Sequence, residues 1–347
     1  MDGRGDPEPM DEGDGPRPLH EWDRDELALA MRTAIIGEDG EYYVEMEPNW
    51  SAADELIARR DSVGSERVVA RRATEGVERE RPGVDTVGVR TESVIIGTDG
   101  RTVVNPTTVD PFYAVTRYNT FTGSTGQTFG TTCTGAWIGP WTFVTAAHCI
   151  RRTVGGALPT RIRFEPARND LALPYGTYDC RMYDSDPNNN ITMALPAGWT
   201  GAGEAEAQFD YAVFDMWPCQ TVPLATTLDG YVVDSGSATY SMHGYPQETA
   251  TRCPGSPYTD VFQCGMSGSG YINDFRIESQ YIDSSGGQSG GPWWRNVSGS
   301  NYLAAVHRGS RSFFDFGMCG FSNCVRNYGR RIDSTVESFI QVNSYDY

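Results

Sequence analysis

The chain has 347 residues, of which 39% are hydrophobic and 12% aromatic, so it is long enough to form a packed core and an additional segment. Its formal net charge of −18 argues against nucleic acids and anionic membranes as partners. The sequence has no run of eighteen apolar residues, and it therefore predicts no transmembrane helix.

The first 92 residues form an acidic segment. They hold 24 of the 46 acidic residues and 12 of the 28 basic ones, a net charge of −12, whereas the other 255 residues have a net charge of −6. Residues 1–20 are rich in Asp, Glu, Gly and Pro, which is typical of disorder, and they lack the apolar stretch of a signal peptide. Helix and turn signals follow from Glu21 to about Arg60. The segment is either a solvated tail or a propeptide.

The remainder of the chain predicts an all-β domain. Short runs rich in Val, Ile, Thr, Tyr, Phe and Trp, such as residues 112–118, 142–145 and 302–306, alternate with clusters of Gly, Pro, Asn and Asp. A C-terminal helix is expected from Asp333, because residues with N-capping side chains precede an amphipathic run there.

Three short motifs carry candidate catalytic residues. His148 follows a strand-like apolar run, Asp210 lies between Phe209 and Tyr211, and Ser289 lies within Gly-Gly-Gln-Ser-Gly-Gly-Pro at residues 286–292. A serine hydroxyl is a weak nucleophile that needs a base within hydrogen-bond reach, and the base needs an orienting partner. The order His, Asp, Ser is that of chymotrypsin-type enzymes. Three motifs in this order outweigh the alternatives of a core histidine and a plain glycine-rich loop.

The glycines around Ser289 serve the same chemistry. They allow the backbone angles of the sharp turn that presents the hydroxyl. The amides of Gly287 and Ser289 can then point together at a developing oxyanion.

These segments resemble the chymotrypsin-type serine proteases and, more closely, the bacterial glutamyl endopeptidases. Four stretches carry the closer resemblance: residues 93–108 resemble the mature amino terminus, 133–140 the strand that leads to the catalytic histidine, 282–290 the nucleophile loop, and 303–307 the strand of the substrate pocket. The resemblance implies two six-stranded antiparallel barrels. His148 and Asp210 would come from the first barrel and Ser289 from the second, with the active site between them.

The resemblance begins immediately after the acidic segment. We therefore expect residues 1–92 to be a propeptide and residues 93–347 to be the protease domain. An enzyme that cuts after glutamate could process itself at Glu92–Ser93, and in the relatives the new α-amino group lies near the substrate pocket. Three other processing sites stay open: Glu78, Glu80 and Arg90.

All eight cysteines lie in the predicted protease domain, which favours disulfides and an oxidising compartment. The resemblance implies the bridge Cys133–Cys149. Cys253–Cys264 and Cys319–Cys324 are expected because they are close in sequence, and Cys180–Cys219 follows by elimination. No CxxC pair or histidine cluster favours zinc, and we expect neither a metal nor a cofactor.

The candidate specificity residues point to different substrates. His307 lies where glutamyl endopeptidases keep the histidine that binds the carboxylate of the residue before the cleaved bond (P1). Ser284 could add a hydroxyl donor. Asp283 lies six residues before Ser289, where trypsin-like enzymes keep the aspartate that binds Arg or Lys. Arg308 replaces a small or polar residue of the relatives, and we expect it to point into solvent or to meet acidic substrates.

Together, these features predict a secreted, monomeric serine endopeptidase that acts on polypeptides and cuts after Glu or Asp. Two alternatives stay open: cleavage after Arg or Lys through Asp283, and a non-catalytic binding protein on the same fold.

Overall fold

A computed structural model describes most of the chain from Val94 onward. The described residues are 94–123, 128–151, 158–182, 191–196, 198–199, 206–217, 219, 227–233, 236–247, 253–254, 261–314, 323–344 and 346, together with three short strands before them. The chain divides into a unit of residues 1–67 with Tyr347, and a unit of residues 68–346. In the first unit, β1 (Ala34–Ile36) pairs antiparallel with β2 (Tyr42–Val44). Apart from these strands, the expectations for residues 1–87 lie outside the described residues.

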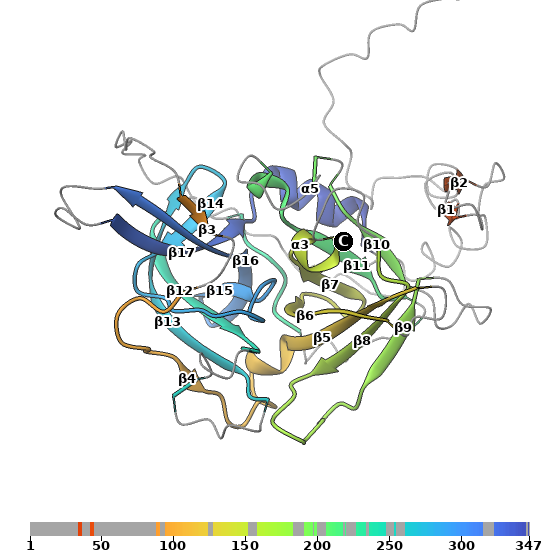
Figure 1. Ribbon diagram of the computed structural model, residues 1–347, viewed down its shortest axis with the longest axis horizontal. Coiled ribbons are helices and arrows are strands. Elements are labelled where there is room, and N and C mark those ends of the chain that lie inside the picture. The colour runs from red at the N-terminus through yellow and green to blue at the C-terminus, as the bar shows by residue number, and fades with distance from the viewer. Residues whose placement is uncertain are drawn as a thin grey trace, which may run out of the picture. The chain divides into compact units, whose positions relative to one another are not determined.

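The second unit contains two antiparallel sheets (Figure 1). The first has the order β10-β11-β7-β6-β5-β8-β9 and follows a short 3-10 helix, η2 (Phe112–Ala114). Its strands are β5 (Val115–Thr122), β6 (Thr128–Trp137), β7 (Thr142–Thr145), β8 (Arg161–Pro166), β9 (Tyr178–Arg181), β10 (Thr192–Ala194) and β11 (Ala212–Asp215). The sheet curls around buried aromatic side chains whose ring centroids lie 5.1–6.4 Å apart: Tyr118, Trp137, Phe143, Phe164 and Phe214.

The second sheet closes into a barrel. Its order is β12-β15-β16-β17-β14-β13-β4, and pairing of β12 with β13 joins six of these strands in a ring. At its edges β4 pairs with β13, and β3 (Gly88–Arg90) pairs antiparallel with β16. The strands are β4 (Thr102–Val103), β12 (Ala238–Gly244), β13 (Cys264–Asn273), β14 (Arg276–Ser279), β15 (Pro292–Val297), β16 (Ser300–Phe314) and β17 (Asn323–Arg331).

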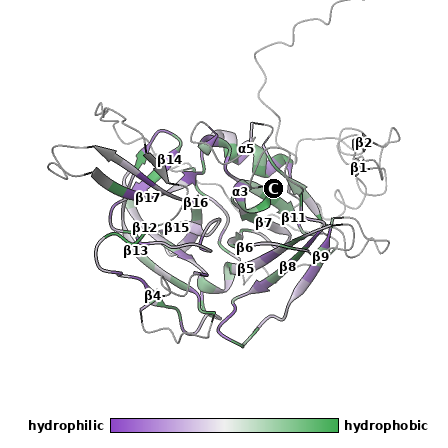
Figure 2. Cartoon of the chain, in the orientation of Figure 1, coloured by the Kyte–Doolittle hydropathy of each residue, from purple (hydrophilic) through white to green (hydrophobic). Residues whose placement is uncertain are grey.

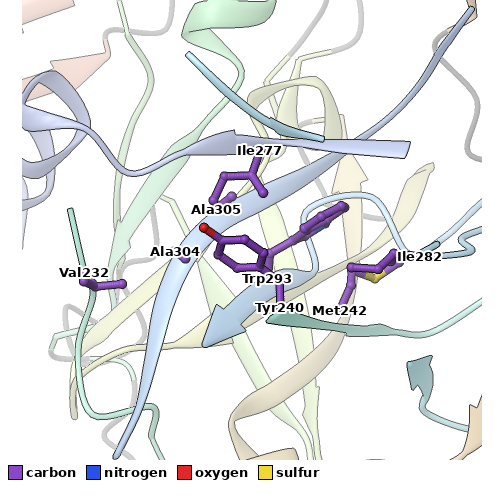
Figure 3. Packing of buried hydrophobic residues seen from close by; sticks show 8 residues of the cluster. All are labelled: Val232, Tyr240, Met242, Ile277, Ile282, Trp293, Ala304 and Ala305. Atoms are coloured by element: carbon purple, nitrogen blue, oxygen red, sulfur yellow. The ribbon is translucent and has the colours of Figure 1, made fainter. Parts of the chain in front are cut away.

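Trp293 lies at the centre of the barrel core (Figure 3). Its ring packs against Tyr240, with centroids 6.4 Å apart, and the same cluster contains Met242, Ile277 and Ile282. Hydrophobic and hydrophilic residues are interspersed along the strands of both sheets (Figure 2). This is the pattern expected where one face of a sheet packs inward.

In its described part the unit also contains three short helices: α3 (Ala147–Ile150), the 3-10 helix η4 (Ala207–Phe209) and α5 (Ser334–Val342). None of the helices in the described part of the chain is long and apolar enough to span a membrane.

Three of the four expected disulfides are confirmed: Cys133–Cys149, Cys180–Cys219 and Cys253–Cys264. The fourth, Cys319–Cys324, falls outside the residues whose side chains are described.

The expected all-β class and the C-terminal helix are confirmed. The second sheet is the six-stranded barrel that the resemblance implied, whereas the first has seven short strands, and its end strands β9 and β10 are not paired to each other among the described residues. Residues 95–96 are irregular, and the backbone N–H of Ile96 donates to the side chain of Asp283 instead of to a neighbouring strand.

Asp333 begins α5 as expected, and it stabilises the helix in two ways. Its carboxylate accepts from the backbone N–H groups of Thr335 and Val336, and it pairs with Arg330 at 2.8 Å. Burial acts to raise the pKa of Asp333, but the hydrogen bond and charge of Arg330 outweigh it and hold the pKa below the ordinary 3.8.

We expect Asp333→Ala to lower the free energy of unfolding by about 1–2 kcal/mol through loss of the helix cap. Asp333→Asn retains an N-capping side chain and loses only the charge, so it should cost less. Because the folded pKa is lowered, the advantage of the native chain over Asp333→Asn is present above about pH 4 and is lost as the pH falls through the folded pKa. Urea unfolding of both variants at pH 7 and pH 3 measures this, and an equal deficit at the two pH values would contradict it.

Candidate active site

The predicted base and its partner are in contact. Pairing of β11 with β7 places Ala212 opposite Thr145, and this brings Asp210 next to the short helix that carries His148. Asp210 Oδ2 lies 2.8 Å from His148 Nδ1, and Oδ1 accepts from the His148 backbone N–H at 2.9 Å. An ionised carboxylate can only accept hydrogen bonds, so the proton lies on Nδ1 and the neutral ring presents the lone pair of Nε2. This is the tautomer that a general base requires.

Asp210 is fully buried and has a second partner, the cationic side chain of Arg308. Arg308 Nε lies 2.8 Å from the same Oδ2, and the Arg308 side chain is only 3% exposed. Burial acts to raise the pKa of Asp210, but the charges and hydrogen bonds of His148, followed by the charge of Arg308, hold it below its ordinary value. Asp210 is therefore a carboxylate throughout the neutral range.

Our expectation that Arg308 points into solvent or meets acidic substrates was wrong. A β-bulge explains the difference: His307 pairs with Gly329 and Gly309 with Tyr328, so Arg308 is the extra residue of β16. A bulge re-aims the side chain it carries. Here it turns Arg308 inward, where Nη1 also donates to the hydroxyl of Tyr328 at 2.8 Å.

The loop of Ser289 lies against the segment of His148. The carbonyl oxygen of Ser289 accepts from the N–H of Thr134 on β6 at 2.9 Å and lies 3.6 Å from the sulfur of Cys149, the residue that follows His148. Within the described residues no hydrogen bond joins the Ser289 hydroxyl to His148. Such contacts are often long before a substrate binds.

Glycine is required on both sides of Ser289. Gly287 and Gly290 have φ angles of +89° and +80°. A Cβ atom at Gly290 would lie 2.1 Å from Thr145 Oγ1, and one at Gly287 would lie 2.5 Å from the carbonyl oxygen of Tyr245. The N–H groups of Gly287 and Ser289 have no acceptor among the described residues.

His307 faces this loop from β16. Its backbone N–H donates to Gly291, and its carbonyl accepts from Gly290, both at 2.8 Å. The indole N–H of Trp293 donates to His307 Nδ1 at 3.1 Å, which leaves the ring proton on Nε2. Burial, assisted by the charge of His148, lowers the pKa of His307 to about 3, so the ring is neutral.

The other predicted specificity residues are buried beside the chain that follows Ser93. Ser284 donates its N–H to the carbonyl of Val94, and its hydroxyl is buried without a hydrogen-bond partner in the described structure. Asp283 Oδ1 accepts from the N–H of Ile96 at 2.6 Å, and Oδ2 accepts from that of Gly100 at 2.8 Å. Both oxygens of Asp283 therefore hold backbone amides.

Two further residues position the loop and were not found from the sequence. Thr134 Oγ1 donates to the carbonyl of Gly287 at 2.8 Å. Arg101 is buried and donates to Gln288 Oε1 at 2.7 Å and to the hydroxyl of Ser285 at 2.5 Å. No local pattern around either residue distinguishes it from an ordinary strand or surface residue.

His243 does not join the site. His243 stacks on Trp294 with ring centroids 4.5 Å apart, and burial lowers its pKa to about 3, so it is a core residue. His20 lies outside the described residues. No group of three or more His, Cys, Asp or Glu side chains with the arrangement of a metal site occurs among the residues described.

Comparisons with known proteins give relatives in sequence and in structure. No protein-family model matches the chain. A glutamyl endopeptidase of Bacillus licheniformis is 29% identical over 209 residues, which are 59% of this chain and 55% of the relative. A Bacillus subtilis protein named extracellular metalloprotease is 30% identical over 228 residues, 65% of each chain. The chain thus spans between half and two thirds of the length of these curated relatives.

Among solved structures, a Glu endopeptidase in complex with MPD superposes with a TM-score of 0.50 at 23% identity, covering 71% of this chain and 97% of the other. The protease Anisep of Arthrobacter nicotinovorans gives a TM-score of 0.45 at 19% identity over 70% and 98% of the two chains. The first similarity confirms the expected chymotrypsin-like fold, and the sequence similarity confirms the expected resemblance to bacterial glutamyl endopeptidases.

The steric requirement at Gly290 can be tested. We expect Gly290→Ala to disrupt the loop, because the new methyl group overlaps Thr145 and the positive φ angle is unfavourable. The melting temperature should fall, with a cost of about 1–3 kcal/mol or more. Differential scanning calorimetry measures the change.

Gly299→Ala is the matched control. Gly299 also has a positive φ angle, +97°, but nothing lies within 4 Å of its Cβ position. It should show only the backbone penalty of about 1 kcal/mol. Equal losses in the two variants would contradict a steric role for Gly290.

Proposed function

We propose that this chymotrypsin-like serine protease homologue, a relative of the bacterial glutamyl endopeptidases, is a secreted endopeptidase that hydrolyses polypeptides through Ser289, His148 and Asp210. The observation that carries the proposal is the buried contact of Asp210 with His148 Nδ1 at 2.8 Å, against which the glycine-flanked loop of Ser289 is packed. The disulfides support an oxidising, extracellular location, and the Bacillus subtilis relative is named as extracellular.

The contact of Asp210 with His148 supports the following steps. His148 Nε2 accepts the proton of the Ser289 hydroxyl as its oxygen bonds to the scissile carbonyl carbon. Asp210 stabilises the resulting imidazolium. The N–H groups of Gly287 and Ser289 hold the oxyanion, each donor contributing roughly 100- to 1,000-fold in rate. His148 then gives its proton to the leaving amine, and a water molecule releases the acyl group from Ser289.

The contacts favour glutamate at P1. His307 presents a proton on Nε2 because Trp293 occupies Nδ1, and Ser284 has a buried hydroxyl without a partner in the described structure. Both are donors suited to a carboxylate. Asp283 is the residue on which cleavage after Arg or Lys would depend, but its two oxygens already accept backbone N–H groups. This disfavours the trypsin-like alternative.

We also propose that residues 1–92 are removed by cleavage at Glu92–Ser93. Contacts on both sides of this bond support it. Before the bond, β3 pairs with residues 310–312 of the strand that carries His307. After it, Val94 donates to Asn327 Oδ1 at 3.1 Å and accepts from Ser284.

The catalytic assignment is tested with a serine-reactive fluorophosphonate. We expect the processed native chain to be labelled on Ser289, to cleave a peptide library, and to begin at Ser93. Ser289→Ala should show no label, no cleavage and no chain that begins at Ser93, while its circular dichroism stays unchanged. Mass spectrometry reads the label and the new terminus.

The controls separate the alternatives. Glu92→Gln should retain reactive Ser289 but lose the cut at residue 93. Hydrolysis should persist in a chelator, and inhibition by the chelator with no label on Ser289 would favour a metal-dependent reaction. A folded, processed chain with neither label nor cleavage would favour the non-catalytic binding protein.

The preference for glutamate is tested by mapping cleaved bonds. We expect cuts mainly after Glu, and His307→Ala should lower kcat/KM for Glu substrates by about 10- to 100-fold, the value of a hydrogen bond to a charged group. His243→Ala is the matched control, because His243 is also a buried, neutral histidine and lies outside the site. It should retain the preference. Cuts after Arg that vanish in Asp283→Asn would overturn the assignment.

A further inference from the structure

The cationic partner of Asp210 has no role in the mechanism derived above. Arg308 is nearly inaccessible to solvent, and its Nε shares Oδ2 of Asp210 with His148 Nδ1, each at 2.8 Å. It is not a surface arginine that happens to be near, because the bulge in β16 directs it inward and the hydroxyl of Tyr328 holds its Nη1. The Asp210–His148 pair of the proposed mechanism thus has a third member, Arg308. When His148 is protonated, the one carboxylate has two positively charged partners.

This arrangement affects the pH range in which His148 can act as a base. A carboxylate next to an imidazole stabilises its protonated form, and an additional positive charge beside the same carboxylate opposes it. His148 must be unprotonated to take the proton from Ser289. A permanent cation on Asp210 therefore keeps the base available at lower pH.

The inference rests on the proposed function. We propose that Arg308 is a positioning residue of the triad, whose permanent charge fixes Asp210 as a carboxylate and extends the activity toward acidic pH. Among the described residues, Tyr118 of β5 and His307 of β16 also act on Asp210, and neither carries a charge at neutral pH. Arg330 contacts η4, the 3-10 helix that directly precedes Asp210, through the carbonyl of Gln208, but its charge is paired with Asp333. Arg308 is the cation in direct contact.

The test compares neutral and charged substitutions. In Arg308→Gln and Arg308→Ser, we expect the acid limb of the pH profile of kcat/KM to move to higher pH by about one unit, the usual effect of a neighbouring charge. Arg308→Lys retains the charge and should keep the limb within a few tenths of a unit of the native position. A structural role alone would lower the rate in all three variants without moving the limb.

A second readout does not depend on activity. In the Ser289→Ala background, the pH titration of the His148 ring is followed by NMR, with the signal assigned by its loss in His148→Ala. Its midpoint should move to higher pH in Arg308→Gln by the same amount. This measurement tests the inference even if the chain hydrolyses no peptide, and an absence of hydrolysis with the expected NMR shift would reject only the proposed function.

Arg326→Gln is the matched control. Arg326 is also buried and pairs with a buried carboxylate, Glu278, at 3.2 Å, away from Asp210. It should cost stability but leave both pH profiles in place. A folded Arg308→Gln variant whose midpoints match the native chain would overturn the proposal. A shift in Arg308→Lys as large as in the neutral variants would also overturn it. Failure of both neutral variants to fold would do the same, because the arginine would then be a requirement for folding.

Discussion

The structure around the site depends on supplying one buried carboxylate, that of Asp210, with hydrogen bonds and a compensating positive charge. An ionised aspartate removed from water is stable only when it is hydrogen-bonded and paired with positive charge. Asp210 meets this requirement with two donors from His148 and one from Arg308. The first residue comes from the helix after β7 and the second from β16 of the other sheet. The carboxylate is therefore satisfied only when the two sheets meet in one particular arrangement.

The loop of Ser289 is likewise held by contacts from both sheets. Thr134 of the first sheet binds its carbonyl groups at Gly287 and Ser289, and His307 of the second binds its backbone at Gly290 and Gly291. The close approach on the first-sheet side leaves no space for a Cβ atom at Gly290. A loop held from both sheets and limited by backbone contacts has little freedom to shift, which is what a nucleophile and two oxyanion donors need.

Local sequence patterns were sufficient to predict several of these features. The motifs around His148, Asp210 and Ser289, the cap at Asp333 and the pairs Cys133–Cys149 and Cys253–Cys264 each depend on short-range spacing or on a recognisable segment. Cys180–Cys219, whose cysteines are 39 residues apart, followed only by elimination. Arg308 could not be placed in this way, because its direction depends on the pairing of β16 with β17 and on the bulge between them. Asp283 was equally out of reach, since its partners Ile96 and Gly100 lie more than 180 residues earlier in the chain.

The segment that follows the proposed processing site connects these observations. Val94 binds Asn327 and Ser284, Asp283 holds the amides of Ile96 and Gly100, and Arg101 holds Gln288, the neighbour of Ser289. An amino group created at Ser93 would belong to the residue directly before Val94, whose backbone contacts Asn327 and Ser284. Before cleavage the same nitrogen is a neutral amide. If Glu92–Ser93 is the processing site, cleavage adds a positive charge close to Ser284, where a substrate carboxylate is proposed to bind. Activation and specificity would then depend on the same short stretch of chain.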